Sequence, residues 1–244
     1  MFDIAKDYDC SKIATGHYAK IEKCGDRFLL KKPKDLSKDQ TYVLYSLTQY
    51  QLERTLMPLG DLTKDEVRAF AQDWGFVNAN KPDSQDICFV PDGDYANFIS
   101  KYTDTPLESG NFVDTKGNVI GSHGGMIKYT IGQRKGLGMG FGRPVYVVSK
   151  DPLKNSVVLG DEGDLYSKKV IVRNVNFIAI DKLTSPLNCM GKLRYRQMEE
   201  ACKITPLDET TLLAEFEKPQ RAVTSGQAAV FYDGDVVVCG GTIE

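Results

Sequence analysis

The chain has 244 residues, of which 41% are hydrophobic and 26% are charged, proportions typical of a globular protein with its own hydrophobic core. The formal net charge of −2 argues against a uniformly basic nucleic-acid-binding protein, although a local basic face is still possible. No apolar run approaches the roughly 18 residues that span a membrane. The N-terminal residues lack the apolar core of a secretory signal, so we expect a cytoplasmic protein.

The six cysteines are scattered and form no Cys-x-x-Cys pair, and the chain has only two histidines. This pattern excludes a disulfide framework, a zinc site and a histidine-rich metal centre. Cysteine side chains are therefore left for packing or for thiol chemistry.

The first part of the chain has an α/β pattern. Lys12–Thr15 predicts a short strand that ends at Gly16, and Tyr18–Lys31 predicts a hairpin that turns at Gly25. Asp39–Leu56 has a helical composition, but its apolar residues change from one helix face to another near Thr48.

That change of face predicts two short helices, the second capped by Thr48. Thr63–Glu66 forms a capping box, and the apolar residues that follow recur at helical spacing as far as Trp74. The spacing predicts that Trp74 lies in the core.

The pattern changes after about Asp92. Tyr95–Tyr102 predicts a brief helix, and glycines and short strands then dominate. Gly121–Gly142 holds eight of the 22 glycines, interleaved with lysines and arginines. Within it, the basic loop Lys128–Gly138 suits contact with a nucleotide or an RNA backbone, and it equally suits a solvated loop. The loop lacks the Gly-Lys-Ser/Thr ending of a Walker A motif.

The last third predicts a small closed β-barrel, because six segments of alternating polarity are separated by turn residues. These segments are Val170–Ile180, Met190–Arg196, Ala201–Thr205, Leu212–Phe216, Ala228–Tyr232 and Val236–Cys239. The four cysteines at positions 24, 189, 202 and 239 fall on strands or turns, which favours packing roles for them.

Cys88 is the strongest candidate for chemistry. It lies between the polar, proline-containing residues that begin at Lys81 and the apolar residues that end at Val90. A loop gives a thiol access to substrate, and an apolar anchor fixes its position. The alternative is a buried cysteine that acts as a small hydrophobic side chain.

Two further segments suit ligand contact at the ends of elements. Gly16 and His17 follow a strand, where a ligand can approach the backbone, although a simple turn is equally compatible. Lys38, Asp39 and Gln40 precede a helix. Asp39 suits an N-cap, and a helix N-terminus also favours phosphate.

Arg194 and Arg196 flank Tyr195 on a predicted barrel strand, so alternation puts both arginines on one face. Such a face could clamp phosphates of RNA. A solvent-exposed face is the alternative.

Six segments, in this order, resemble the tRNA-specific 2-thiouridylases, and the resemblance spans nearly the whole chain. The segments are Ile13–Ala19, Lys38–Tyr45, Asp83–Phe89, Thr130–Gly138, Lys192–Gln197 and Ser225–Gly234.

The resemblance implies a mixed α/β plus β fold in three parts. These are an incomplete adenine-nucleotide α-hydrolase (Rossmann-like) domain at 1–94, a small central domain at 95–166 and a six-stranded β-barrel at 167–244. It implies ATP, with Mg²⁺ in the complete enzyme, as cofactor and no protein-bound metal. It also implies tRNA and a persulfide-donor protein as partners.

In this family, ATP adenylates the C2 oxygen of a tRNA wobble uridine, and a cysteine persulfide then delivers sulfur to C2. By position, Cys88 matches the persulfide cysteine and Gly16 matches a nucleotide-contacting residue. The positions that match residues near tRNA are His17, Lys38, Asp39, Gln40, Arg194, Tyr195 and Gln227.

Two family features are absent from the 244 residues: the pyrophosphate loop Ser-Gly-Gly-x-Asp-Ser and a first catalytic cysteine followed by Asn. Cys10 lacks that Asn and receives no catalytic role. We therefore expect a C-terminal portion of a 2-thiouridylase, arising by truncation, an internal start or a broken gene, that cannot complete thiolation alone. The alternatives are a non-catalytic tRNA-binding module and, more distantly, an ATP-dependent ligase or amidotransferase of the same superfamily.

Overall fold

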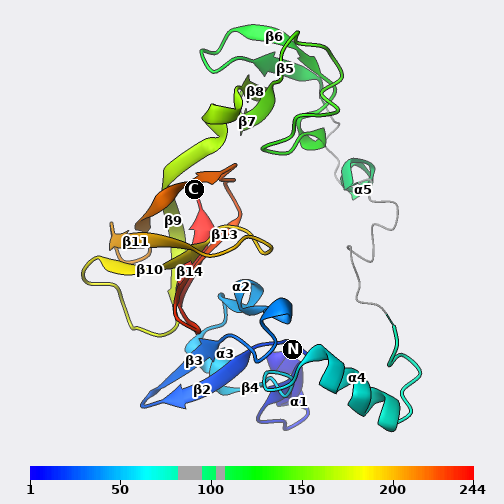
Figure 1. Ribbon diagram of the computed structural model, residues 1–244, viewed down its shortest axis with the longest axis vertical. Coiled ribbons are helices and arrows are strands. Elements are labelled where there is room, and N and C mark those ends of the chain that lie inside the picture. Colours follow the sequence, from blue (N-terminus) through cyan, green and yellow to red (C-terminus); the bar gives the residue numbers. More distant parts are fainter. Residues whose placement is uncertain (82–94, 103–107) are drawn as a thin grey trace. The chain divides into compact units, whose positions relative to one another are not determined.

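The computed structural model describes residues 1–81, 95–102 and 108–244 (Figure 1). Its backbone contacts divide the chain into two compact units. Unit 1 comprises Met1–Lys81, Lys168–Lys218 and Thr224–Glu244, and unit 2 comprises Pro82–Ser167, as far as it is described, and Pro219–Val223. The three-domain division with boundaries after residues 94 and 166 stays a prediction.

The N-terminal part of unit 1 contains short elements. Its helices are α1 (Phe2–Asp7), η1 (Leu36–Lys38, a 3-10 turn), α2 (Thr41–Leu44), α3 (Gln49–Glu53) and α4 (Lys64–Asp73). Its strands are β1 (Ile13–Ala14), β2 (Lys20–Cys24), β3 (Arg27–Lys31) and β4 (Thr55–Leu56). β1 pairs in parallel with β4, and β2 pairs with β3 as the expected hairpin, with Gly25 at a positive φ of 58° in the turn.

The predicted helix caps are confirmed. Thr48 and Gln51 form a capping box at the start of α3, and Thr63 and Glu66 form another at the start of α4. The predicted core position of Trp74 is wrong, because this residue is 72% exposed. Helical spacing identifies an apolar face, but it does not say whether another element covers that face.

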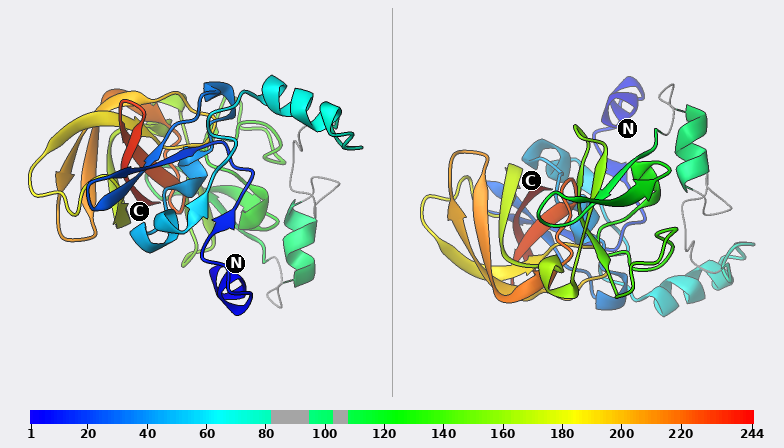
Figure 2. Two further views of the ribbon diagram at one scale, coloured as in Figure 1. Left: turned by 90° about the horizontal axis from the view of Figure 1, so that it is seen from below. Right: turned by 90° about the horizontal axis from the view of Figure 1, so that it is seen from above.

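The closed barrel of six antiparallel strands is confirmed (Figure 2). The strands are β9 (Tyr166–Phe177), β10 (Leu187–Lys192), β11 (Glu200–Pro206), β12 (Leu212–Arg221), β13 (Ala228–Asp233) and β14 (Val236–Ile243). They follow the order β13-β10-β11-β12-β9-β14, and the pairing of β13 with β14 closes the ring. Closure leaves no free edge among these six strands.

The N-terminal hairpin extends the barrel sheet. β3 pairs with β14 through Lys31 and Val236, and Gly240 of β14 lies against the ring of Tyr45, where a Cβ would come within 2.5 Å. One buried cluster draws side chains from both parts of unit 1: Ala19, Leu30, Tyr42, Leu44, Leu52, Ile178, Val230, Tyr232 and Val237. The N-terminal segment and the barrel therefore share a hydrophobic core.

The four cysteines that were expected to have packing roles differ in burial. Cys202 and Cys239 are buried in the barrel, and Cys189 is half-buried with its Sγ 3.7 Å from that of Cys202. Cys24 is exposed, so the expected packing role is wrong for this residue. It is the last residue of β2, beside the hairpin turn.

Unit 2 contains a four-stranded sheet in the order β6-β5-β8-β7. Its elements are α5 (Tyr95–Tyr102), β5 (Gly110–Val113), β6 (Val119–His123), η2 (Met126–Lys128), β7 (Tyr146–Asp151), β8 (Ser156–Gly160) and η3 (Glu162–Leu165). Its core is built around Phe112, whose ring meets those of His123, Tyr129 and Phe141.

The burial of His123 predicts that the stability of unit 2 depends on pH. The ring is buried, its Nδ1 accepts a hydrogen bond from the Gly125 N–H at 3.2 Å, and its Nε2 has no partner among the described residues. Burial lowers the pKa of His123 below 6.5, since the charged ring is poorly solvated there. Below pH 6.5 the unfolded chain binds a proton that the folded chain excludes.

We expect this contribution to stability to be complete above pH 6.5 and to decline as the pH falls toward the pKa of the folded state. His123→Asn keeps an acceptor near the position of Nδ1 but cannot be protonated. Urea unfolding at pH 7.5 and pH 5 should show a smaller loss of stability for the variant. Equal losses in the two proteins would contradict the assignment.

Candidate functional site

The loop after β1 presents open backbone. Gly16 is exposed, and an added Cβ would meet only Leu59 Cδ1, at 3.8 Å. His17 is half-buried, with Nδ1 3.1 Å from Thr15 Oγ1. The space beside the Gly16 backbone is therefore open, and the expected nucleotide contact there stays a prediction.

Gln40 joins this loop to the segment before α2. Its Oε1 accepts from the Tyr18 N–H at 2.8 Å, and its own N–H donates to the Tyr18 carbonyl at 3.1 Å. Lys38 ends the 3-10 turn η1, and its N–H donates to the Asp35 carbonyl. Two segments that are separate in the sequence, at Gly16–Tyr18 and Lys38–Gln40, thus meet in the structure.

Asp39 caps α2 from one position further out than expected. Its Oδ1 accepts from the N–H and the hydroxyl of Thr41 at 2.9 and 2.7 Å, and Gln40 occupies the N-cap. Because α2 has four residues and Asp39 occupies its first N–H, few helix N–H groups are left for a ligand here. The expected phosphate contact at this N-terminus stays a prediction.

Tyr42 lies where the N-terminal segment meets the barrel. Its hydroxyl donates to the Ala228 carbonyl at 2.8 Å, its ring centroid lies 6.1 Å from that of Tyr195, and Lys192 Nζ lies 6.0 Å from its ring. Burial raises the pKa of Tyr42 to about 12, so the hydroxyl stays protonated and acts as a donor.

Thr41 and Tyr232 complete this arrangement. Thr41 Oγ1 is 3.3 Å from the Tyr232 hydroxyl, and Lys32 Nζ lies 4.6 Å from the Tyr232 ring centroid. Lys32 also forms an ion pair with Glu199 at 2.7 Å. We call Thr41, Tyr42, Lys192, Tyr195 and Tyr232 the Tyr42 cluster.

Arg194 and Tyr195 reach this cluster from a turn. β10 ends at Lys192, so the expectation that Arg194–Arg196 alternate along a strand is wrong. Arg194 Nη2 donates to Thr224 Oγ1 at 3.3 Å, and Arg196 is exposed. A turn sets side-chain directions residue by residue, without the alternation of a strand.

Gln227 lies beside the same cluster. It is exposed, immediately precedes Ala228, and its N–H donates to the Thr224 carbonyl at 3.2 Å. Candidate residues of three separate segments therefore lie beside Tyr42 or its partners: Asp39 and Gln40, Arg194 and Tyr195, and Gln227. No such contact places Lys38 there among the described residues, and Cys88 lies outside them.

Tyr42 and Lys192 were not among the site residues predicted from the sequence. Both lie inside segments that carried the family resemblance, but no local pattern shows that these segments meet.

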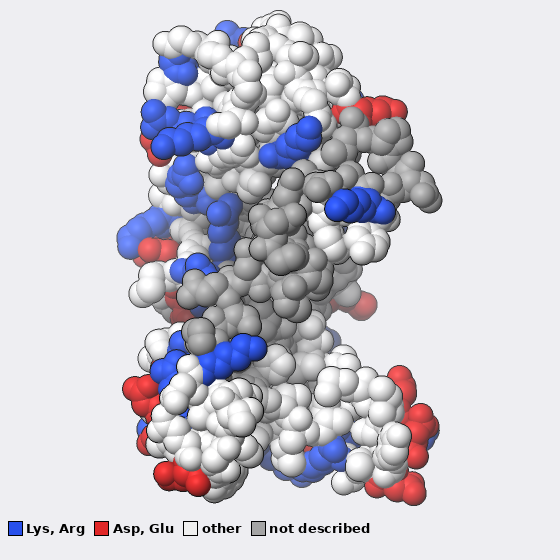
Figure 3. Space-filling view, turned by 90° about the vertical axis from the view of Figure 1, so that its right-hand side faces the viewer, with Lys and Arg blue, Asp and Glu red and all other residues white. Residues whose placement is uncertain are grey.

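Surface charge, metal ligands and helix length add three observations. On the face drawn in Figure 3, lysine and arginine side chains form separate patches, and acidic side chains show mainly at the margins. In the described part of the chain, no three His, Cys, Asp or Glu residues are grouped to hold a metal ion. None of the described helices is long and apolar enough to cross a membrane.

Three family models match successive parts of the chain. The tRNA methyl transferase HUP domain matches residues 1–92, the tRNA methyl transferase PRC-barrel domain matches 96–161, and the aminomethyltransferase β-barrel domain matches 167–243.

Relatives named tRNA-specific 2-thiouridylase MnmA match nearly the whole chain. The protein of Clostridioides difficile (strain 630) is 52% identical over 242 residues, covering 98% of this chain and 67% of the relative. This chain belongs to the tRNA-specific 2-thiouridylase family. The Acetivibrio thermocellus protein is 53% identical over 95% of this chain and 65% of its own length. A Clostridium botulinum (strain Okra) relative is 48% identical, and the match covers 100% of this chain and 69% of the relative. The chain thus spans about two thirds of the length of these 2-thiouridylases.

Proposed function

We propose that the chain acts in the 2-thiolation of a tRNA uridine, with Cys88 carrying the sulfur as a persulfide and the Tyr42 cluster contacting the RNA. A persulfide-donor protein would load Cys88. The observation that carries the RNA contact is the convergence of separate segments on Tyr42, together with membership of the 2-thiouridylase family.

The Tyr42 cluster has the properties of a stacking site for a base. Tyr195 is 43% exposed, and the buried ring of Tyr42 lies beside it. Arg194 occupies the adjacent position, and Lys192 adds a second cation. An exposed aromatic ring with neighbouring cations binds unpaired bases through stacking and phosphates through charge.

The described residues fit ATP in part. The open backbone at Gly16 suits close approach by a nucleoside, but the 244 residues contain no Ser-Gly-Gly-x-Asp-Ser sequence. ATP would supply the activation of the uridine C2 oxygen. The described residues show no site for the ATP phosphates or for the adenylation step comparable to the open backbone at Gly16.

The proposed function is tested by thiolation of a tRNA transcript with ATP and a persulfide donor. We expect the purified 244-residue chain to bind the transcript without forming 2-thiouridine, because its sequence contains no Ser-Gly-Gly-x-Asp-Ser segment to stabilise the pyrophosphate leaving group. Nucleoside analysis by mass spectrometry measures the product. Formation of 2-thiouridine by this chain would refute the expected inactivity. Absence of tRNA binding would refute the RNA contact.

The stacking role predicts that Tyr195→Ala weakens binding of the transcript by about 5- to 150-fold, since stacking of one base on an aromatic ring is worth about 1–3 kcal/mol. Tyr195→Phe should bind nearly normally. Tyr166, which is 45% exposed in unit 2, provides a matched control as Tyr166→Ala. Fluorescence anisotropy measures Kd. Equal weakening by the two alanine variants would argue against a specific role for Tyr195.

A further inference from the structure

We propose that Arg134–Arg143 of unit 2, called here the glycine loop, binds backbone phosphates of the RNA substrate. The inference rests on the proposed function and adds a second contact to it. The loop lines a pocket of about 510 Å³ together with Pro144 and Val145. None of its residues was among those that the family resemblance placed near tRNA.

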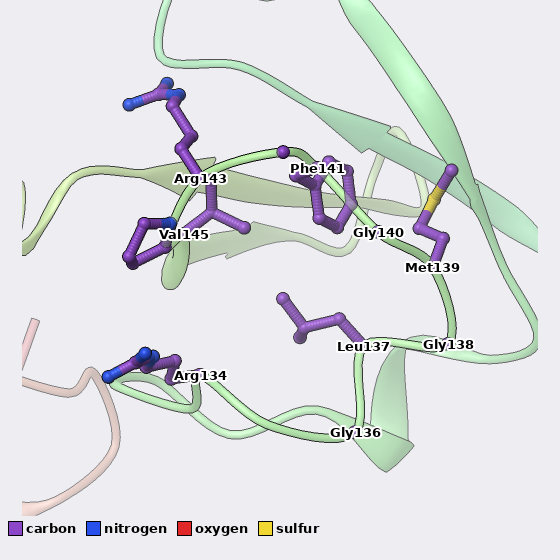
Figure 4. A pocket seen from close by; sticks show the side chains of 11 residues that line it. Arg134, Gly136, Leu137, Gly138, Met139, Gly140, Phe141, Arg143 and Val145 are labelled. Carbon is purple, nitrogen blue, oxygen red and sulfur yellow. The ribbon is translucent and has the colours of Figure 1, made fainter.

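Apolar side chains and glycines alternate along the glycine loop. The apolar side chains anchor the loop, and the glycines leave the backbone uncovered. Leu137 is buried, and Phe141 packs against the unit 2 core with its ring 6.0 Å from that of Phe112. Between and beside them, an added Cβ at Gly138, Gly140 or Gly142 would meet nothing within 4 Å. The apolar side chains thus fix the loop, and the glycines leave its backbone accessible (Figure 4).

The preceding segment is tied down by hydrogen bonds. The Gly132 N–H donates to the Val147 carbonyl at 2.8 Å, and the Val147 N–H donates to the Gln133 carbonyl at 2.9 Å. The Gln133 side chain accepts from the Thr130 N–H and donates to the Lys135 carbonyl, both at 2.9 Å. These hydrogen bonds therefore hold the start of the glycine loop in place.

The backbone donors of the glycine loop are available to a ligand. Among the described residues, no backbone N–H from Arg134 to Arg143 donates to a protein acceptor. Gly136, Gly138 and Gly142 have positive φ angles of 74°, 80° and 69°, a conformation that suits glycine. Accessible backbone N–H groups in such turns form concave sites for anions.

The charges favour a phosphate. Arg134 and Arg143 lie at the same end of the pocket, on opposite sides of it (Figure 4). The Arg143 guanidinium is held by Asp161, and Arg134 has no ion-pair partner in the described part of the chain. No acidic side chain lines the pocket. Two guanidinium groups beside accessible N–H groups suit a phosphodiester.

The pocket composition favours RNA over a free nucleotide. Its lining has no Ser, Thr, Asp or Glu, so no hydroxyl or carboxylate there could hold Mg²⁺ or read a ribose, as nucleotide sites do. A contact to the sugar–phosphate backbone needs only the cations and the N–H groups.

The test compares three variants for binding to a tRNA transcript over a range of salt concentrations. Arg134→Gln removes one cation of the pocket. Gly140→Ala adds a methyl group in open space and leaves an ordinary φ angle. Lys154→Gln is the charge-matched control, since Lys154 is 80% exposed elsewhere in unit 2. Thermal unfolding checks that each variant is folded, and a parallel titration uses ATP.

We expect Arg134→Gln to weaken RNA binding about fivefold and to lower the salt slope by about one. Gly140→Ala should weaken binding severalfold, and Lys154→Gln should bind as the parent chain does. If both loop variants bind RNA as the parent chain does, the glycine loop does not contact the RNA, and the proposed function is unaffected. A loss of ATP binding with unchanged RNA binding would also overturn the inference. If the parent chain binds no transcript, the proposed function fails as well.

Discussion

Cys88→Ser is expected to abolish sulfur uptake by the chain at its principal site. A thiol accepts sulfur as its thiolate, and the persulfide formed is a stronger acid and nucleophile than the thiol. A serine hydroxyl cannot replace it. Incubation with cysteine persulfide, followed by intact-mass and peptide-mass measurement, should locate one added sulfur on Cys88 and none in the variant. Because Cys88 lies outside the described residues, the prediction derives from the sequence.

The other cysteines provide graded controls. Cys10 and Cys24 are exposed, so Cys10→Ser and Cys24→Ser test whether exposure alone is sufficient for labelling. Cys239 is buried in the barrel, and burial raises the pKa of its thiol, which disfavours reaction there. Both exposed-site variants should retain uptake at Cys88. Principal labelling of Cys10 or Cys24 would disprove the assignment of Cys88.

Leu52→Ala should lower the free energy of unfolding by about 2–5 kcal/mol, the usual cost of truncating a buried leucine. Leu52 is fully buried in the core that the N-terminal segment shares with the barrel. We therefore expect the barrel to be destabilised together with residues 41–53. Urea unfolding measures the loss, and hydrogen exchange at β13 and β14 shows whether the barrel takes part.

Val43→Ala is the matched control, because Val43 lies in α2 and is 51% exposed. Its effect should stay within about 0.5 kcal/mol. If Leu52→Ala accelerates exchange in α2 and α3 while β13 and β14 keep their protection, the two parts of unit 1 do not share one cooperative core.

The resemblance to 2-thiouridylases came from short segments, but the sequence did not show which of them meet. The Lys38–Tyr45 segment contains Tyr42, which contacts both the turn after β10 and the start of β13. These contacts join residues that are far apart in the chain, so no local sequence pattern predicts them. The same limit explains Trp74, where the helix was predicted correctly and the burial was not.

By itself, the sequence determined the six barrel strands, the hairpin turn at Gly25 and the caps at Thr48 and Thr63. Alternation, turn chemistry and capping act between residues that are near in sequence, so their signals are local. Tertiary structure alone decided that Arg194 leaves the strand and that the N-terminal hairpin joins the barrel sheet. Those outcomes depend on which distant surfaces bury apolar area against each other.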